Sequence, residues 1–325
     1  MEAGAVTTQR DARATQIAVA IPCYNEAITV AKVVDDFRRA LPEAAIHVFD
    51  NNSTDGTGKA AARAGASVHL VPARGKGEVV RALFRVIDAD VIVMVDGDST
   101  YEASRVRELI APVIAGEAEM TVATRLRQAG PENFRTFHVF GNRLVLRAIN
   151  TLFGTGLSDV LSGYRAFSRR FVKTMPVLSR GFEVETEITL HALEHRQPII
   201  EVPLPYGVRP VGSASKLNTL QDGRRVLTTL FRLYKDYRPL MFFGIPGAIL
   251  LAVGIFAGVL VVGEFIDAGK VTGIARAVFA VSSCLIGTVA LATGLILDTV
   301  NRRARELYVL LADHVVDLRQ RPDSR

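Results

Sequence analysis

The chain has 325 residues, a formal net charge of +6 and an apolar fraction of 49%, and it contains no tryptophan. This length accommodates one α/β domain of roughly 200 residues together with additional elements. Because the basic residues gather beside apolar segments near the C-terminus, the charge favours a membrane or a phosphorylated substrate over nucleic acid as a partner.

The first half of the chain alternates short apolar runs with helical patterns. We expect a polar, flexible tail over residues 1–15 and, after it, a domain over residues 16–212 that is large enough to be an enzyme. Its expected strands lie at about 17–21, 45–49, 68–71 and 91–95, and its expected helices at about 27–40, 57–64 and 75–88. Strands that alternate with helices in this way predict an α/β fold with a doubly wound, mostly parallel sheet.

Two carboxylates follow the fourth expected strand, Val91–Val95. Asp96 and Asp98 are separated by one glycine. Burying bare carboxylates costs several kcal/mol each unless a positive charge lies beside them. The carboxyl end of a parallel strand is where open α/β sheets bind ligands, so we expect these residues to hold Mg²⁺ or Mn²⁺. The alternative is a polar turn that caps a helix beginning near Ser99.

Two common nucleotide-binding classes are excluded by the loops that follow the strands. The first strand is followed by residues 22–26, Pro-Cys-Tyr-Asn-Glu, rather than by Gly-x-Gly-x-x-Gly, and the chain has no Walker loop. A dinucleotide-dependent hydride transferase and a P-loop NTPase are therefore not expected.

The C-terminal third contains two uncharged apolar runs, Leu240–Gly263 and Ala277–Leu297. Each is long enough to cross a hydrocarbon core of roughly 30 Å, which predicts a transmembrane helical hairpin over residues 239–299. A juxtamembrane loop and basic amphipathic helix over 213–238 should lie in the headgroup layer. Arginines flank the hairpin on the side of both termini, which places the N-terminal domain and the 300–325 tail in the cytoplasm, beside the cell (inner) membrane.

Five motifs in order carry a family resemblance. Residues 22–26, the Asp-Asn-Asn-Ser-Thr-Asp-Gly-Thr run at 50–57, and Asp96-Gly97-Asp98 resemble glycosyltransferase family 2, the inverting enzymes of the GT-A fold. Residues 158–165 and 212–217 resemble loops of polyprenyl-phosphate sugar transferases such as dolichyl-phosphate mannose synthase and its bacterial undecaprenyl-phosphate counterparts. The resemblance covers about residues 16–240 and implies a GT-A, Rossmann-like domain.

The resemblance implies a nucleotide-sugar site on the donor side. Its donor-binding residues would be Pro22, Tyr24, Glu26, Asp50, Lys76 and Asp96, with Asp96 and Asp98 as metal ligands. A carboxylate at position 50 can accept an N–H from uracil or guanine, so UDP and GDP donors both remain open. For Asp55 the plain interpretation is a helix N-cap. A helix N-terminus at Lys76 is suited to an anion.

On the acceptor side the resemblance implies a lipid phosphate held by basic residues. The residues that would bind it are Arg125, Arg143, Ser162, Arg165 and Lys216, with Arg147 as an alternative to Arg143. Asp159 is the base or the orienting carboxylate, and with Arg125 and Asp98 it completes the catalytic set. A phosphate monoester is mostly dianionic at pH 7, which favours an orienting role for Asp159. Glu185 would pair with Lys216 or Arg165, or only favour its helix N-terminus.

The expected activity is transfer of a single hexose-type sugar to undecaprenyl or dolichyl phosphate, in cell-envelope glycan biosynthesis. The alternatives are a family-2 transferase with another lipid or a polysaccharide acceptor, and a non-catalytic membrane scaffold that binds nucleotide sugars. The sequence leaves the sugar, the prenyl length and homo-oligomerisation open.

Overall fold

The computed structural model describes residues 15–126, 136–181, 183–207, 228, 231–271 and 273–320. By its internal contacts the chain divides into two compact units, residues 1–133 with 157–215 and residues 134–156 with 216–325. The predicted tail over 1–15 lies outside the described residues except for its last position.

The first unit is built on a seven-stranded mixed sheet with the order β3-β2-β1-β4-β6-β5-β7. The strands are β1 Ile17–Cys23, β2 Ala45–Asp50, β3 Ser67–Leu70, β4 Val91–Met94, β5 Met120–Leu126, β6 Arg165–Ser168 and β7 Ile199–Pro205. The predicted mostly parallel sheet is confirmed. The exception is β6, which runs antiparallel to both of its neighbours, β4 and β5.

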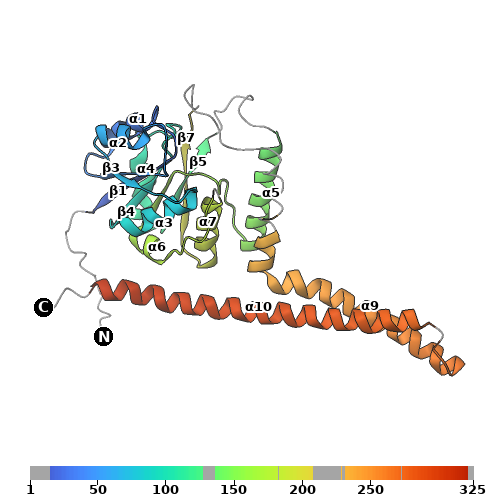
Figure 1. Cartoon of the computed structure of the whole chain (residues 1–325). Helices are drawn as coiled ribbons and strands as arrows, with labels where there is room; N and C mark the ends of the chain where they lie inside the picture. The colour runs from blue at the N-terminus through green and yellow to red at the C-terminus, as the bar shows by residue number, and fades with distance from the viewer. Residues whose placement is uncertain are drawn as a thin grey trace, which may run out of the picture. The chain divides into compact units, whose positions relative to one another are not determined.

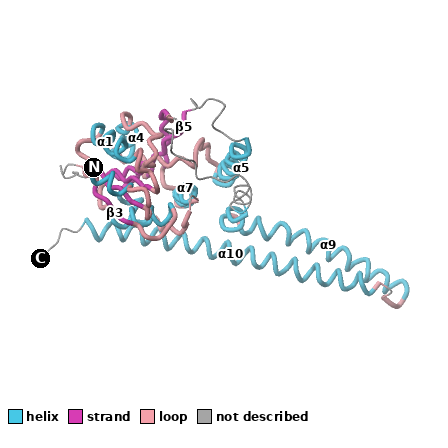
Figure 2. Tube along the Cα trace, turned by 45° about the horizontal axis from the view of Figure 1, so that its top comes forward, coloured by secondary structure: helices cyan, strands magenta, loops and turns pink. Residues whose placement is uncertain are grey.

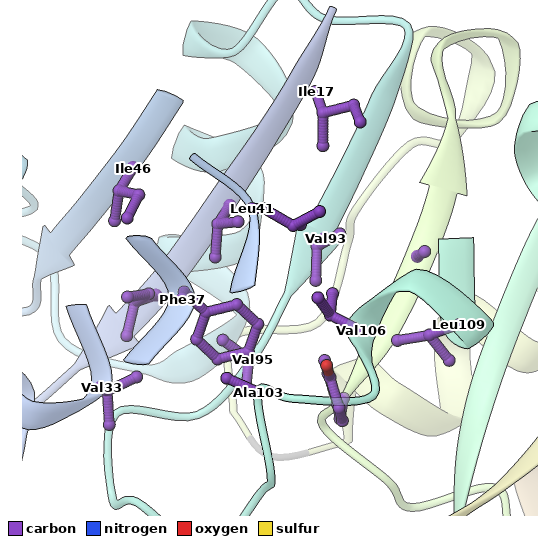
Figure 3. Packing of buried hydrophobic residues seen from close by; sticks show 14 of the residues in the cluster. Ile17, Val33, Phe37, Leu41, Ile46, Val93, Val95, Ala103, Val106 and Leu109 are labelled. Atoms are coloured by element: carbon purple, nitrogen blue, oxygen red, sulfur yellow. The ribbon is translucent and has the colours of Figure 1, made fainter. Parts of the chain in front are cut away.

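Helices cover both faces of this sheet (Figure 1). They are α1 Val30–Ala40, α2 Thr57–Arg63, α3 Lys76–Val86, α4 Val106–Ile114, α6 Arg169–Thr174 and α7 Val184–Glu194. Side chains of α1, α2 and α4 share one buried cluster, in which Phe37 packs with Val93 and Val106 (Figure 3). Side chains of α3, α6 and α7 fill a second cluster on the opposite face. β1 and β4, in the middle of the sheet, are buried along their whole length, as their unbroken apolar runs predict.

The loops after β1, β2 and β4 meet at the carboxyl edge of the sheet. Asn51 N–H donates to the Cys23 carbonyl oxygen at 2.8 Å, which ties the second loop to the first. The Thr29 hydroxyl donates to the Gly97 carbonyl oxygen at 2.6 Å, which ties the first to the third. The motifs at 22–26, 50–57 and 96–98 are thereby held in one surface.

The second unit contains α5 Thr136–Phe153, α9 Pro239–Ala268 and α10 Ile274–Gln320. Figure 2 shows α9 and α10 side by side. A Cβ atom built on Gly247 would lie 2.9 Å from the Gly287 carbonyl oxygen, so the two helices touch at their backbones. Small residues permit such close packing between apolar helices.

Both long helices are apolar enough to cross a membrane, over Pro239–Ala268 and Ile274–Leu310. Only 11% and 22% of the residues in their most apolar windows are buried, so the two helices do not form the core of a folded domain in this structure. The predicted pair of apolar C-terminal helices is confirmed. The second helix is longer than predicted and continues through the expected tail to Gln320. Of the predicted amphipathic helix, residues 228 and 231–237 are helical, and the rest lies outside the described residues.

Candidate active site

Asp98 lies in a tight turn directly after β4. Its side chain is 3% exposed, and its Oδ1 accepts hydrogen bonds from the Thr100 N–H at 3.1 Å and the Thr100 hydroxyl at 2.6 Å. Ser99, between them, has a positive φ of 60°. The turn therefore fixes a buried carboxylate at the sheet edge, and Thr100 orients it. The alternative of a helix beginning near Ser99 is wrong, because the next helix, α4, begins at Val106.

Asp96 is paired with the lysine that opens α3. Lys76 Nζ lies 2.6 Å from Asp96 Oδ1 and 2.5 Å from Glu185 Oε1 on α7. Burial alone would lower the pKa of Lys76, but the charges and hydrogen bonds of both carboxylates more than offset burial and raise the pKa above its ordinary value. Lys76 is therefore a permanent cation in this site. Glu185 contacts Lys76, a partner that the sequence did not predict for it, whereas Lys216, one of the two predicted partners, lies outside the described residues.

Close backbone approaches hold this group of charges in place. A Cβ atom on Gly75, whose φ is 127°, would lie 2.0 Å from the Arg180 carbonyl oxygen, so the loop before α7 packs directly on the start of α3. A Cβ atom on Gly163 would lie 2.4 Å from Asp96 Oδ2. Lys76 therefore contacts one oxygen of the Asp96 carboxylate and the Gly163 backbone lies beside the other, while the side chain stays 26% exposed.

The residues predicted for the nucleotide base and ribose gather around the loops after β1 and β2. Asp50 is 8% exposed, and its Oδ1 accepts from the Ser53 N–H at 2.9 Å. The Arg74 guanidinium lies over the Tyr24 ring, 5.3 Å from the centroid. Glu26 N–H donates to the Thr57 hydroxyl at 2.9 Å. The structure thus brings Tyr24, Glu26 and Asp50 into neighbouring loops at the edge that carries Asp96.

Asp55 braces the start of α2, although the N-cap residue of that helix is Gly56 rather than the expected Asp55. Its Oδ1 accepts from the Thr57 N–H at 3.0 Å and its Oδ2 from the Ala27 N–H at 3.0 Å. Partial burial would raise the pKa of Asp55, but these hydrogen bonds outweigh burial and lower the pKa below its ordinary value. Asp55 is a structural carboxylate that joins the loop after β1 to the start of α2.

The loop over residues 158–163 carries Asp159 and is held mainly by Glu201 of β7. Glu201 Oε1 accepts from the Ser158 N–H at 2.8 Å and from the Asp159 N–H at 2.9 Å. Glu201 Oε2 accepts from the Ser158 hydroxyl at 2.9 Å. Asp159 Oδ1 in turn accepts from the Leu161 N–H at 2.9 Å. A fixed carboxylate therefore sets the backbone that presents Asp159.

Arg165 supports the same loop from inside the protein. It is fully buried, and its guanidinium donates to the carbonyl oxygens of Val160 and Ser162, both at 2.8 Å, and to the Thr189 hydroxyl at 2.8 Å. These hydrogen bonds within the protein engage the guanidinium that was predicted to bind phosphate. Arg165 is therefore a positioning residue. Ser162 is also fully buried, and its hydroxyl lies 3.3 Å from the hydroxyl of Tyr101.

The other predicted phosphate ligands are only partly described. Arg125 lies in β5, where its backbone pairs with Leu204 of β7, and its side chain lies outside the described residues. Lys216 lies outside them altogether. Arg143 and Arg147 are exposed on α5, in the second unit. Their contact with an acceptor phosphate stays a prediction.

Comparison with known proteins decides the family. A model described as glycosyl transferase family 2 matches residues 18–175. The chain is 34% identical over 294 residues to Glycosyltransferase AglJ of Haloferax volcanii, covering 89% of this chain and 95% of that one. The chain belongs to glycosyl transferase family 2. It is also 28% identical to the polyprenol monophosphomannose synthase of Mycolicibacterium smegmatis, over 71% of this chain and 91% of that one.

The solved structures confirm the GT-A-like fold for this family-2 protein. Glucosyl-3-phosphoglycerate synthase from Mycobacterium tuberculosis, solved in complex with Mn²⁺, UDP-glucose and phosphoglyceric acid, matches with a TM-score of 0.56 and 26% identity. The match covers 67% of this chain and 79% of that chain. This family-2 chain is therefore a glycosyltransferase related to polyprenyl-phosphate sugar transferases.

Asp96 and Asp98 suit a hard divalent cation by their chemistry, since a partly exposed and a buried carboxylate stand two residues apart in one turn. Among the described residues, no three His, Cys, Asp or Glu side chains form a ready metal cage. Mg²⁺ and Mn²⁺ are commonly held by one or two carboxylates, with waters and substrate phosphates in the remaining positions. The residues present fit a cation that binds together with a diphosphate.

Three positioning residues escaped sequence analysis in this family-2 site. The sequence indicated Glu185 but not its contact with Lys76, and it did not indicate Tyr101 or Glu201. Glu201 did leave a signal, because a carboxylate inside the short apolar strand Ile199–Pro205 needs a partner. Tyr101, whose hydroxyl accepts from the Gly163 N–H at 3.1 Å, has no such signal. Its partner is 62 residues away in the sequence.

Proposed function

We propose that this protein transfers one hexose-type sugar from a UDP- or GDP-sugar to polyprenyl phosphate at the cytoplasmic face of the cell membrane, with inversion at the anomeric carbon. Undecaprenyl and dolichyl phosphates are the acceptor class. The transfer would depend on Mg²⁺ or Mn²⁺ bound at Asp96 and Asp98.

One observation carries the proposal: a family-2 catalytic fold and two exposed apolar helices long enough to cross a membrane occur on the same chain. A sugar acceptor that is itself anchored in the membrane suits such a chain better than a soluble one. A relative named polyprenol monophosphomannose synthase, aligned over 71% of this chain, supports the same acceptor class.

On the donor side, the described residues bind and orient the nucleotide sugar. Asp50 would accept an N–H from the base, and Tyr24 and Glu26 would contact base and ribose, beside Pro22. Lys76, a permanent cation 2.6 Å from Asp96, would supply positive charge near the diphosphate. A divalent cation bound at Asp98 would neutralise the leaving nucleoside diphosphate.

On the acceptor side, little proton transfer is needed because a phosphate monoester is already mostly dianionic at pH 7. Positioning and charge stabilisation should then supply most of the rate. Asp159 would orient the phosphate or its arginines, and its hydrogen bond from Leu161 N–H supports a fixed, orienting carboxylate. Arg125 is the arginine we expect to bind the phosphate, because the guanidinium fork matches phosphate oxygens.

The test is donor turnover by the full-length protein in a neutral detergent. A panel of UDP- and GDP-sugars, radiolabelled in the sugar, would be incubated with Mn²⁺ and with undecaprenyl phosphate, 3-phosphoglycerate or no acceptor. We expect label in the organic extract with undecaprenyl phosphate alone, and NMR of the product should show an anomeric configuration opposite to that of the donor. Asp98→Asn should lower kcat at least about 100-fold, consistent with loss of several kcal/mol of charge stabilisation.

The remaining outcomes separate the alternatives. Transfer to 3-phosphoglycerate or to an added glycan, but not to undecaprenyl phosphate, would replace the proposed acceptor class. Tight nucleotide binding without release of nucleoside diphosphate from any donor would indicate a non-catalytic scaffold.

A further inference from the structure

Lys76 bridges two carboxylates, and one of them has a spare oxygen. Its Nζ lies 2.6 Å from Asp96 Oδ1 and 2.5 Å from Glu185 Oε1. The second oxygen of Glu185, Oε2, is buried and has no hydrogen-bond partner among the described residues. Glu185 itself is 4% exposed. A buried carboxylate oxygen without a partner is costly, so its persistence calls for an explanation in function.

The charges at this place do not balance. Asp96 and Glu185 carry two negative charges, and Lys76, which contacts both, supplies one positive charge between them. An ammonium group has three hydrogen-bond donors, of which two point at the two carboxylates. The arrangement has room for a further cation at Asp96, but that cation must compete with the ammonium group already bound there.

We propose that Lys76 is the counter-cation of Asp96 in the donor-free protein, and that Glu185 is the positioning residue that receives it when a divalent cation binds. The ammonium group then leaves Asp96 Oδ1 and bonds both oxygens of Glu185, including Oε2. Asp96 is released for the cation or the donor, while Lys76 stays paired and beside the diphosphate.

Glu185 is required because a buried ammonium group cannot be left alone. Lys76 has a side chain only 12% exposed, so leaving Asp96 without a second partner would strand a buried charge. Glu185 removes this cost, since its own side chain is 6% exposed and already within hydrogen-bond distance. Without Glu185, Lys76 would hold Asp96 more tightly and oppose the cation.

This inference rests on the proposed function in one respect, that a divalent cation binds at Asp96 and Asp98. The experiment therefore measures cation binding directly, by electron paramagnetic resonance of free Mn²⁺ during titration of the full-length protein, without nucleotide. The proteins are wild type, Lys76→Met, Glu185→Gln, the double variant and Asp98→Asn. Glu117→Gln, at an exposed glutamate, is the matched control.

The decisive quantity is the coupling between the two substitutions. We expect Lys76→Met to tighten Mn²⁺ binding about tenfold, because the competitor is gone. Glu185→Gln should weaken Mn²⁺ binding in both backgrounds. We expect the factor of weakening to be at least about five times larger when Lys76 is present than in the Lys76→Met background. The number of sites per chain reports the folded fraction of each variant, so a misfolded variant lowers that number rather than the affinity of the remainder.

The failures are distinguishable. If Glu185→Gln weakens binding by the same factor in both backgrounds, Glu185 acts as a ligand or by its charge alone, and the inference is overturned while the metal site stands. If Asp98→Asn binds Mn²⁺ as wild type does, the metal site of the proposed function is wrong and the inference falls with it. The Glu117→Gln control should match wild type.

Discussion

At the scale of single residues, Glu201 controls the loop that presents Asp159. It accepts two backbone N–H groups and one hydroxyl from Ser158 and Asp159, which makes it the main anchor described for that loop. Hydrogen bonds to a charged acceptor contribute about 1.5–3 kcal/mol each when intact. Glu201 lies in β7, so the anchor is rigid even though the loop is not a regular element.

Glu201→Gln should therefore affect the acceptor more than the donor. An amide keeps one accepting oxygen but turns an N–H toward the loop, so we expect the KM for polyprenyl phosphate to rise about tenfold. The KM for the nucleotide sugar should stay within about twofold. Steady-state kinetics with each substrate varied in turn measures both values, and Glu117→Gln is again the control. Equal rises in both KM values would show general damage and refute the assignment.

His191 makes the stability of the first unit sensitive to acid. Burial, with a smaller contribution from the charge of His195, lowers the pKa of His191 to about 3. At this histidine, the unfolded chain takes up a proton near pH 6.5, whereas the folded protein does not until the pH falls toward 3. The contribution of His191 to the free energy of unfolding is therefore full above pH 6.5 and declines as the pH falls below it. We expect this effect of His191 to lower the free energy of unfolding by about 2 kcal/mol between pH 7 and pH 5.

Calorimetry of wild type and His191→Gln across that range is the measurement. The variant should lose less stability on acidification, and the two pH dependences should be parallel above pH 7. If the variant is as acid-sensitive as wild type, the protonation of His191 is not responsible.

Residue types at the site were more predictable from the sequence than the partners of those residues. Asp96, Asp98, Asp50 and Lys76 were expected at the sheet edge because strand ends and a helix N-terminus can be located from local patterns. The contact of Lys76 with Glu185 joins positions more than 100 residues apart, which depends on how α7 packs on α3 and leaves no local trace. Arg165 was misjudged for a related reason, since a pattern does not show that a side chain is buried.

At the scale of elements, the strands and helices of the first half lie within a few residues of their predicted positions. The direction of β6 was not predicted, because a four-residue strand, Arg165–Ser168, carries no mark of orientation. Its reversal has a use: the loop over 158–163 enters β6 at the edge where β4 ends. An antiparallel neighbour therefore brings Asp159 and Gly163 toward Asp96.

The hairpin of α9 and α10 should depend on glycine where the backbones touch. A Cβ atom on Gly247 would lie 2.9 Å from the Gly287 carbonyl oxygen, whereas a Cβ atom on Gly258, in the same helix, meets no atom within 4 Å. We expect Gly247→Leu to lower the Tm by about 5 °C, as overpacking of 1–3 kcal/mol implies. Gly258→Leu is the matched control and should leave the Tm unchanged. Thermal unfolding in detergent, followed by size-exclusion chromatography, measures both, and equal Tm values would refute close packing.

At the scale of the whole molecule, a catalytic sheet and an apolar helical pair are joined on one chain. The helices expose large apolar side chains along their length, such as Phe256 and Ile266 at 66% and 74%. An apolar surface of this extent is tolerated in a membrane and not in water. The two apolar helices were predictable because their signal lies in composition and length rather than in distant contacts.

The predicted topology places both chain ends in the cytoplasm. Arg302, Arg303 and Arg305 follow the second span, and positive residues are retained on that side during insertion. A C-terminal fusion to green fluorescent protein should fluoresce, and the corresponding alkaline phosphatase fusion should be inactive. The untagged protein should remain in the membrane fraction after carbonate extraction. An active phosphatase fusion would reverse the predicted orientation.

The contact between Gly163 and Asp96 has a consequence for the order of events in catalysis. With no side chain at position 163, the loop that carries Asp159 touches the donor carboxylate by its backbone. Under the proposed function, a shift of that loop on binding one substrate would reach the other subsite directly. By thermodynamic reciprocity, each substrate must then alter the affinity for the other by the same factor. For the proposed reaction, we therefore expect the lipid and the nucleotide sugar each to strengthen the binding of the other.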